Sequence, residues 1–139
     1  MFDHKQTLGY ASAHLARLLA NRLREELSPL GILPAQFTAL AEIALDEGLT
    51  QKELVERLDL EQPGVARTLT NMEKEGWIER RANERGQGLF LTQRSRDVLP
   101  RALAAAQGLN RHALRELSRT EASHMLDAIG EAVEACRKN

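Results

Sequence analysis

Apolar residues recur along this chain at two different spacings, and each spacing predicts the element that carries it. From about Lys5 to Leu27 they return every third or fourth position, which is typical of one face of a long amphipathic helix. Ser28-Pro29 and then Gly31 interrupt the pattern and predict a turn. Pro34 suits the first turn of a second helix, which we expect to end near Gly48. This helix is expected to point its apolar side chains inward at Phe37, Leu40, Ile43 and Ala44.

Two shorter helices are predicted in the middle of the chain. Thr50 and Glu53 have the spacing of a capping box, in which each side chain hydrogen-bonds the backbone amide of the other residue. Pro63 marks the first turn of the next helix, which we expect to end at Gly76. The apolar residues of that helix stand at helical spacing: Val65, Leu69 and Met72.

After Gly76 the apolar period shortens and predicts a β-hairpin. Residues 77–81 and 89–91 are expected to form two strands, and residues 83–88 a tight loop between them. Two helices joined by a short turn and followed by a hairpin form a winged helix-turn-helix. The fold class predicted is therefore mainly α with a small β-hairpin wing.

Two long helices are predicted beyond the hairpin. Thr92 can cap the first, which we expect to run to about Leu117, and Ser118 or Thr120 can cap the second, which runs to about Arg137. With the first helix, they carry more apolar surface than a winged domain of this size can cover, so we expect them to pair with a second chain. The dimer-interface candidates are Leu8, Leu15, Leu109, His112, Leu126, Ile129 and Val133.

Composition narrows the class of protein. The 139 residues and the 42% hydrophobic share fit one globular unit, and no run of 18 apolar residues is available to cross a membrane. Residues 1–9 lack an apolar signal core, and a single cysteine, Cys136, excludes an internal disulfide. We therefore expect a cytoplasmic protein that does not enter a membrane.

Chemistry-bearing motifs are sparse. No Gly-rich phosphate loop, Ser/His/Asp arrangement or paired-carboxylate helix stands out, so we expect neither enzymatic activity nor a cofactor. The four histidines could meet across a dimer as metal ligands, but they lack the clustered spacing of metal sites. Positions at the surface or an interface are favoured for them, and no metal site is predicted.

Charge is segregated along the chain although the formal net charge is only −1. Residues 77–101 contain six basic and three acidic side chains, whereas residues 46–61 contain six acidic and two basic ones. A basic surface for nucleic acid would produce such blocks, and so would a surface laced with salt bridges.

The helix after Pro63 has the polar face that a major groove requires. Its side opposite the apolar stripe is short and polar, with Arg67 suited to guanine or phosphate and Asn71 suited to adenine. An ordinary solvated helix face would look the same. The nucleic-acid candidates on this helix are Gln62, Gly64, Arg67, Thr68, Asn71 and Lys74.

The hairpin loop supplies a second candidate element. Arginines on a small glycine-flanked loop fit a minor groove or the adjoining phosphates, although a merely soluble turn is the alternative. The candidates in the hairpin are Arg81, Asn83, Arg85 and Gln87. Because the tip is so short, we expect Arg85 to reach phosphates more easily than the floor of the minor groove.

At this point the chain resembles the MarR family. The resemblance runs through Leu33-Pro34-Ala35-Gln36-Phe37, Thr50-Gln51-Lys52-Glu53-Leu54, Gln62-Pro63-Gly64-Val65-Ala66-Arg67, Met72-Glu73-Lys74-Glu75-Gly76-Trp77 and Leu91-Thr92. It implies a homodimer that binds double-stranded DNA at a pseudo-palindromic operator. It adds Thr50, Gln51 and Lys52 to the nucleic-acid candidates.

The resemblance also implies a regulator, most often a repressor, that is relieved by a small phenolic or anionic ligand. Such a ligand would bind between the dimerisation helices, residues 1–30 and 92–139, and the winged domain, residues 31–91. Candidate ligand-pocket residues are His14, Leu15, Leu18, Phe37 and Leu40. The family's wing is usually longer and carries Asp-Arg-Arg, so the alternative is a winged-helix module for protein interaction whose DNA face has been lost.

Overall fold

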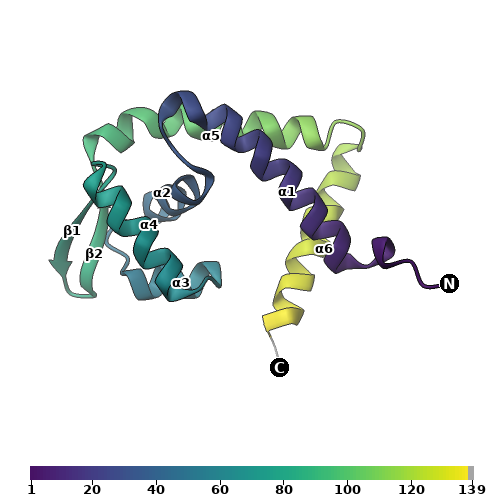
Figure 1. Ribbon diagram of the computed structural model, residues 1–139, viewed down its shortest axis with the longest axis horizontal. Coiled ribbons are helices and arrows are strands. Elements are labelled where there is room, and N and C mark those ends of the chain that lie inside the picture. Colours follow the sequence, from purple (N-terminus) through teal and green to yellow (C-terminus); the bar gives the residue numbers. More distant parts are fainter. Residues whose placement is uncertain (138–139) are drawn as a thin grey trace. The chain divides into compact units, whose positions relative to one another are not determined.

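The computed structural model describes residues 1–137 and divides into two compact units, Met1–Ala106 and the chain from Gln107 onward. Figure 1 shows the order of the elements along the chain. Their bounds are η1 His4–Gln6, α1 Leu8–Leu27, η2 Ser28–Leu30, α2 Pro34–Leu45, α3 Gln51–Leu58, α4 Gln62–Lys74, β1 Ile78–Asn83, β2 Gly86–Leu91, α5 Gln93–Ala113 and α6 Arg119–Arg137. A mainly helical chain with one hairpin confirms the predicted fold class.

Local capping decides where several helices begin. Thr50 and Glu53 form the predicted capping box, with the Thr50 amide donating to Glu53 Oε1 at 3.1 Å and the Glu53 amide to Thr50 Oγ1 at 3.2 Å. Ser118 caps α6 in the same reciprocal way with Glu121. Helix α1 begins later than expected because Thr7 is its N-cap and residues 4–6 form a separate 3-10 turn.

Two expectations about the helices are wrong. Helix α5 ends at Ala113 rather than near Leu117, because the amides of Arg115 and Leu117 bond to carbonyls three residues back and form a turn. The Arg115 guanidinium also donates to the His112 carbonyl, at 2.7 Å. Ala44 is exposed rather than buried, since the inward face of α2 ends with Ile43 and the last turn faces solvent.

The core of the first unit lies among α2, α3, α4, the hairpin and the start of α5. Trp77, the single tryptophan, is only 1% exposed at the junction of α4 with the hairpin. Helix α1 contributes to the core mainly through its last turn, where Leu27 is fully buried. The winged region therefore shares its core with the last turn of α1 and the start of α5.

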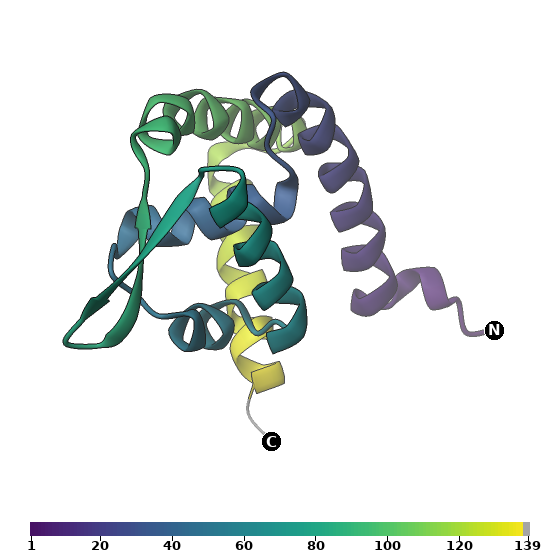
Figure 2. The same cartoon turned by 60° about the vertical axis from the view of Figure 1, so that its left-hand side comes forward.

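The hairpin is antiparallel, with Ile78 paired to Leu91 and Asn83 to Gly86. Strand β2 also bonds the segment before α3, because the Gly48 amide donates to the Leu89 carbonyl at 2.9 Å and the Leu89 amide to the Leu49 carbonyl at 2.8 Å. Figure 2 shows the hairpin standing beside α3 and α4. These extra bonds hold the wing against the helices.

The second unit consists of the end of α5 and helix α6. Helix α6 buries none of its residues, although it has an apolar side. No single described helix is long and apolar enough to cross a membrane; Leu8–Leu30 and Pro34–Leu45 pass that test of length and composition only together, and they are bent by 77°.

Candidate nucleic-acid interface

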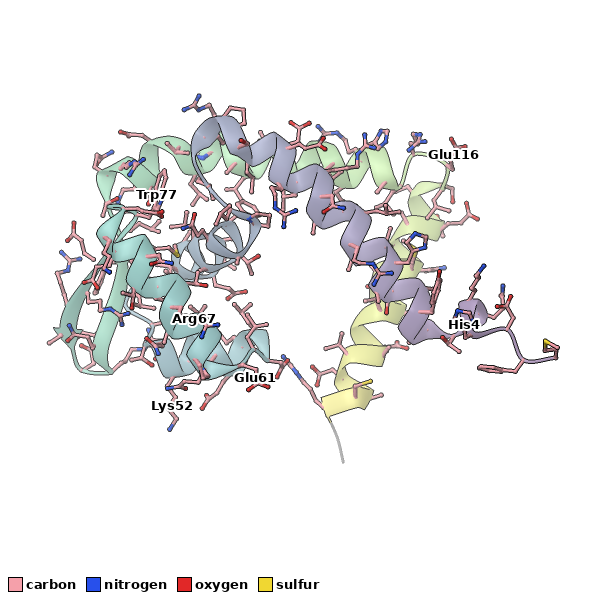
Figure 3. All side chains as sticks on the ribbon, in the orientation of Figure 1. His4, Lys52, Glu61, Arg67, Trp77 and Glu116 are labelled. Carbon is pink, nitrogen blue, oxygen red and sulfur yellow. The ribbon has the colours of Figure 1, made fainter. Side chains whose placement is uncertain are left out.

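Helix α4 presents two chemically different faces. Val65, Leu69 and Met72 are buried, with at most 7% of their surface exposed. Arg67 and Asn71 are exposed on the other side, as is Lys74 at the end of the helix. Figure 3 shows Arg67 on α4, with Lys52 on the neighbouring helix α3. The buried stripe thus fixes the orientation of α4 and leaves its polar face uncovered within this unit.

Of the two threonines of α4, the predicted Thr68 is the less accessible one. Thr68 is half-buried, and its hydroxyl donates to the Gly64 carbonyl at 3.1 Å. Thr70, which the sequence reasoning missed, is exposed and shares a shallow surface with Arg67 and Asn71. The helical period could have found it, because Thr70 lies three residues after Arg67 and therefore on the same side of the helix.

The first turn of α4 is open to solvent. Gln62 is its first residue, and Gly64 has no atom within 4 Å of the position that a Cβ would take. The first amides of a helix lack intrahelical partners and carry the positive end of the helix dipole, so this turn suits a phosphate.

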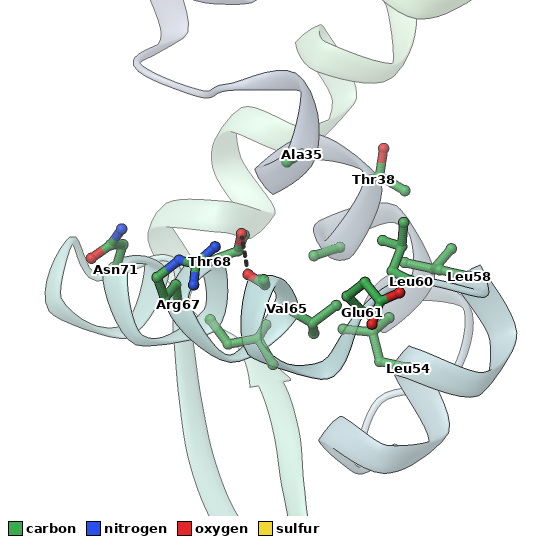
Figure 4. Close-up of a pocket in the computed structure, with 13 residues that line it drawn as sticks. Ala35, Thr38, Leu54, Leu58, Leu60, Glu61, Val65, Arg67, Thr68 and Asn71 are labelled. Carbon is green, nitrogen blue, oxygen red and sulfur yellow. Dashed lines mark hydrogen bonds between the residues drawn. The ribbon is translucent and has the colours of Figure 1, made fainter.

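A groove of about 780 Å³ lies along one side of α4. Figure 4 shows Ala35 and Thr38 of α2 above it, with Leu54 and Leu58 of α3 at one end and Arg67 and Asn71 of α4 at the other. The expected ligand pocket does not coincide with this groove, since none of its five residues lines it. Those five residues are His14, Leu15 and Leu18, which are exposed, Phe37, which is half-buried, and Leu40, which is fully buried.

The first turn of α3 holds three further candidates. The Thr50 hydroxyl is occupied by the capping box, and Gln51 Oε1 accepts from Arg80 Nη1 at 3.4 Å. Lys52 is exposed and extends away from the helix (Figure 3). Of the three side chains, Lys52 is therefore the one best placed for an external anion.

The wing-tip arginine has intramolecular partners. Arg85 Nη1 and Nη2 donate to the two carboxylate oxygens of Asp46 at 2.9 and 2.8 Å, and Nη2 donates to Glu53 Oε2 at 2.5 Å. Its Nε donates to Glu53 Oε1 at 3.2 Å. Hydrogen bonds from Arg85, and then from Arg57, hold the pKa of Asp46 well below its ordinary value. Those from Arg85, and then from the Thr50 backbone, lower the pKa of Glu53.

The other wing candidates are divided between structural and exposed positions. Asn83 donates from Nδ2 to the Gly48 carbonyl at 2.9 Å and accepts from the Arg85 amide at 2.9 Å. Arg81 stacks over the Phe90 ring, with its guanidinium carbon 4.0 Å from the ring centroid. Gln87 is exposed beside the tip. Asn83 therefore builds the tip, while Arg81 and Gln87 stay accessible.

The acidic and basic blocks of the sequence meet in the fold. Arg85 pairs with Asp46 and Glu53, and Arg96 pairs with Glu47 at 2.7 Å. All three pairs join the basic segment 77–101 to the acidic segment 46–61. Part of the segregated charge is consequently neutralised inside the first unit.

The dimer-interface candidates occupy helices with unburied apolar sides. In the first unit, Leu8 and Leu15 of α1 are exposed. In the second unit, Leu109 is half-buried and His112 is exposed on α5, and Leu126, Ile129 and Val133 are exposed on α6. The expected boundaries between the dimerisation helices and the winged domain, at residues 30–31 and 91–92, divide the chain by proposed role and not by packing. They stay a prediction.

Comparison with known proteins finds one family whose model matches part of this chain, and many solved structures with a similar fold. Residues 30–87 match the model of the MarR family. YwoH of Bacillus subtilis, named an HTH-type transcriptional regulator, is 34% identical over 84 residues, which cover 55% of this chain and 61% of YwoH. A Bacillus cereus protein named in the same way is 38% identical over 85 residues, covering 60% of this chain and 58% of that protein. The chain thus spans about three fifths of the length of these relatives.

Solved structures extend the likeness to nearly the whole chain. A putative MarR family transcriptional regulator from Listeria monocytogenes, complexed with 26mer DNA, has a TM-score of 0.87 at 24% identity, covering 94% of this chain and 89% of that one. The oxidised form of MarR from E. coli has a TM-score of 0.77 at 25% identity, covering 91% of this chain and 94% of that one. The chain thus has the fold of winged helix-turn-helix proteins, and its segment 30–87 is similar to the MarR family.

Proposed function

We propose that this protein is a DNA-binding transcription regulator that reads duplex DNA with helix α4. The observation that carries the proposal is the uncovered polar face of α4, with Arg67, Thr70 and Asn71 opposite the buried stripe. A major groove admits one α-helix, and a helix held rigidly by its core side can offer its other side to base edges. The putative regulator from Listeria monocytogenes, which shares this fold and is complexed with 26mer DNA, supports a DNA-binding role.

Each exposed side chain of α4 has a distinct role in this proposal. Arg67 pairs with guanine, Asn71 with adenine, and the Thr70 methyl packs on a thymine methyl. Lys74 and Lys52 neutralise phosphates, and the first turn of α4 receives another. Such phosphate contacts position the protein without reading sequence.

The regulator is proposed to act as a homodimer on a pseudo-palindromic operator. Helices α1 and α6 each carry large apolar side chains, leucine on α1 and leucine, isoleucine and valine on α6, that are exposed to water at a cost in free energy. Pairing with a second copy would bury them and set two α4 helices one helical turn of DNA apart. Light scattering at micromolar concentration should give twice the chain mass, and a monomer would contradict the proposal.

Repression relieved by a small phenolic or anionic ligand, and a cytoplasmic location, stay predictions from the family resemblance. The ligand prediction can be checked directly. A ligand of this kind should weaken operator binding by the wild type, and substitution of the exposed Leu18 on α1 should change the concentration that is required.

The test of DNA reading starts from fragments that the purified protein retains out of random duplex, identified by sequencing. Arg67→Ala should then weaken binding to the selected site while the fold is preserved, because Arg67 is exposed and its truncation leaves no cavity. A bidentate base contact contributes about 1–3 kcal/mol, so a dimer that loses two should lose about 2–6 kcal/mol. That corresponds to a fall in affinity of roughly 30-fold or more.

Arg101→Ala is the matched control, since it removes the same charge from an exposed position on α5. It should leave the ratio of specific to random affinity unchanged, whereas Arg67→Ala should compress that ratio. Equal operator affinity for Arg67→Ala and the wild type would refute α4 as the reader. A wild type without salt-dependent affinity for any duplex would favour a protein-interaction module instead.

A further inference from the structure

The wing tip is built against the helices by a set of contacts that converge on Arg85. Only Glu84 and Arg85 separate β1 from β2. The Arg85 guanidinium bridges two carboxylates from different places in the chain, Asp46 at the C-cap of α2 and Glu53 in α3. Thirty-nine residues separate Arg85 from Asp46, and 32 separate it from Glu53.

These contacts use most of the hydrogen-bonding capacity of the arginine. A guanidinium has five N–H donors in a planar fork, and Arg85 directs its Nε, Nη1 and Nη2 at the four oxygens of Asp46 and Glu53. Bidentate pairs of this kind are the strongest ion-pair geometry, and pairs joined in a network hold their shape better than isolated surface pairs. Only 31% of the Arg85 side chain is exposed.

The backbone of the tip is tied to the same place. Asn83 joins the Arg85 amide to the Gly48 carbonyl through its side-chain amide. Gly88 lies so close to this junction that a Cβ would stand 2.6 Å from Asn83 Nδ2 and 2.8 Å from the Gly48 oxygen. The turn has only two residues, and the strand at Gly88 is closely packed. The tip therefore cannot move toward DNA without breaking the Arg85 contacts.

The local charge is also balanced. Asp46 and Glu53 face Arg85 and Arg57, which itself donates to Asp46 at 2.7 Å. A phosphate that took Arg85 would leave two carboxylates beside the DNA backbone, where like charges repel. DNA contact by Arg85 would therefore break its ion pairs with Asp46 and Glu53 and place these two carboxylates where they repel the DNA phosphates.

We infer that Arg85 is a positioning residue, which fastens the wing to α2 and α3 through Asp46 and Glu53 and does not itself contact DNA. The wing then meets DNA through the accessible Gln87 and Arg81. This inference rests on the proposed function, and it departs from the expectation that Arg85 binds phosphate.

The first experiment needs no DNA. Limited trypsin digestion, read by mass spectrometry, measures cleavage of the Arg85–Gly86 bond, which requires the tip to open. Arg85→Lys keeps both the charge and the trypsin site but lacks the planar fork that bridges two carboxylates. It should be cut at least about tenfold faster than the wild type. Asp46→Asn/Glu53→Gln should show the same acceleration, while Glu84→Gln, the control at the exposed neighbouring position, should not.

The second experiment measures how affinity for random duplex depends on salt. Glu53→Gln/Arg85→Gln removes the arginine while keeping the net charge of the cluster. If Arg85 only positions the wing, this variant binds more weakly with an unchanged log–log salt slope. If Arg85 contacts phosphate, the slope becomes shallower by about 1 unit per arginine. Lys52→Gln is the reference for a phosphate contact and should lose about 1 unit.

The outcomes separate the two proposals. Unaltered cleavage of Arg85→Lys, or a salt slope for the double variant as shallow as that of Lys52→Gln, would overturn the positioning role. Absence of duplex binding by the wild type would overturn the proposed function and, with it, any role of Arg85 at DNA. The trypsin result would even then decide whether Arg85 fastens the tip.

Discussion

Replacing Gly88 by alanine should damage the wing by a single added methyl group. The new Cβ would lie 2.6 Å from Asn83 Nδ2, 2.8 Å from the Gly48 carbonyl oxygen and 3.0 Å from the Phe90 ring. The first two atoms form a hydrogen bond of 2.9 Å, so the methyl group is forced into that bond. One of these neighbours is backbone and cannot rotate away.

The magnitude follows from two terms. Overpacking a tight site costs about 1–3 kcal/mol, and losing the Asn83–Gly48 bond costs about 0.5–1.5 kcal/mol. Gly88→Ala should therefore lower the free energy of unfolding by about 2–4 kcal/mol. With an ordinary urea dependence, the midpoint of unfolding should fall by about 1–2 M.

Trp77 makes the measurement direct, because it is the single tryptophan and is buried next to the hairpin. Its fluorescence should report unfolding in urea, at one fixed protein concentration since a dimer links stability to concentration. Gly64→Ala is the control: no atom lies within 4 Å of its added Cβ, and alanine in a helix is better than glycine by roughly 0.5–1 kcal/mol. Equal midpoints for Gly88→Ala and the wild type would refute the close approach.

Three further outcomes are expected. Hydrogen bonds lower the pKa of Asp46 and Glu53, so these groups stabilise the fold above their ordinary pKa values of 3.8 and 4.5, and this stabilisation is lost as the pH falls below them. In the double variant Asp46→Asn/Glu53→Gln, the urea midpoint of unfolding should therefore fall less steeply with decreasing pH than in the wild type. Leu69→Ala should cost about 2–5 kcal/mol by the same fluorescence assay, and a loss below about 1 kcal/mol would contradict its full burial. Ser118→Ala should cost α6 about 1 kcal/mol by removing a capping box, measurable as lost helical circular dichroism on heating; an unchanged melt would mean the cap is dispensable.

Local features of this protein were predictable from sequence because the interactions that produce them span three or four residues. The capping box at Thr50 and Glu53, the buried stripe of α4 and the hairpin after Gly76 all depend on residue spacing within one element. Helical periodicity places Arg67 and Asn71 opposite the stripe whatever the rest of the chain does. The fold class and the proposed DNA-reading surface follow from that.

Only the tertiary structure decided what the charged blocks do. The partners of Arg85 lie 32 and 39 residues away, and no local spacing encodes which carboxylate an arginine will meet after folding. The same holds for Arg96 and Glu47, 49 residues apart. Packing also decided that Thr68 lines the groove beside α2, because the direction from which α2 covers α4 is not encoded in the spacing of α4 itself. A sequence states which groups are present, and packing determines which of them remain available to a partner.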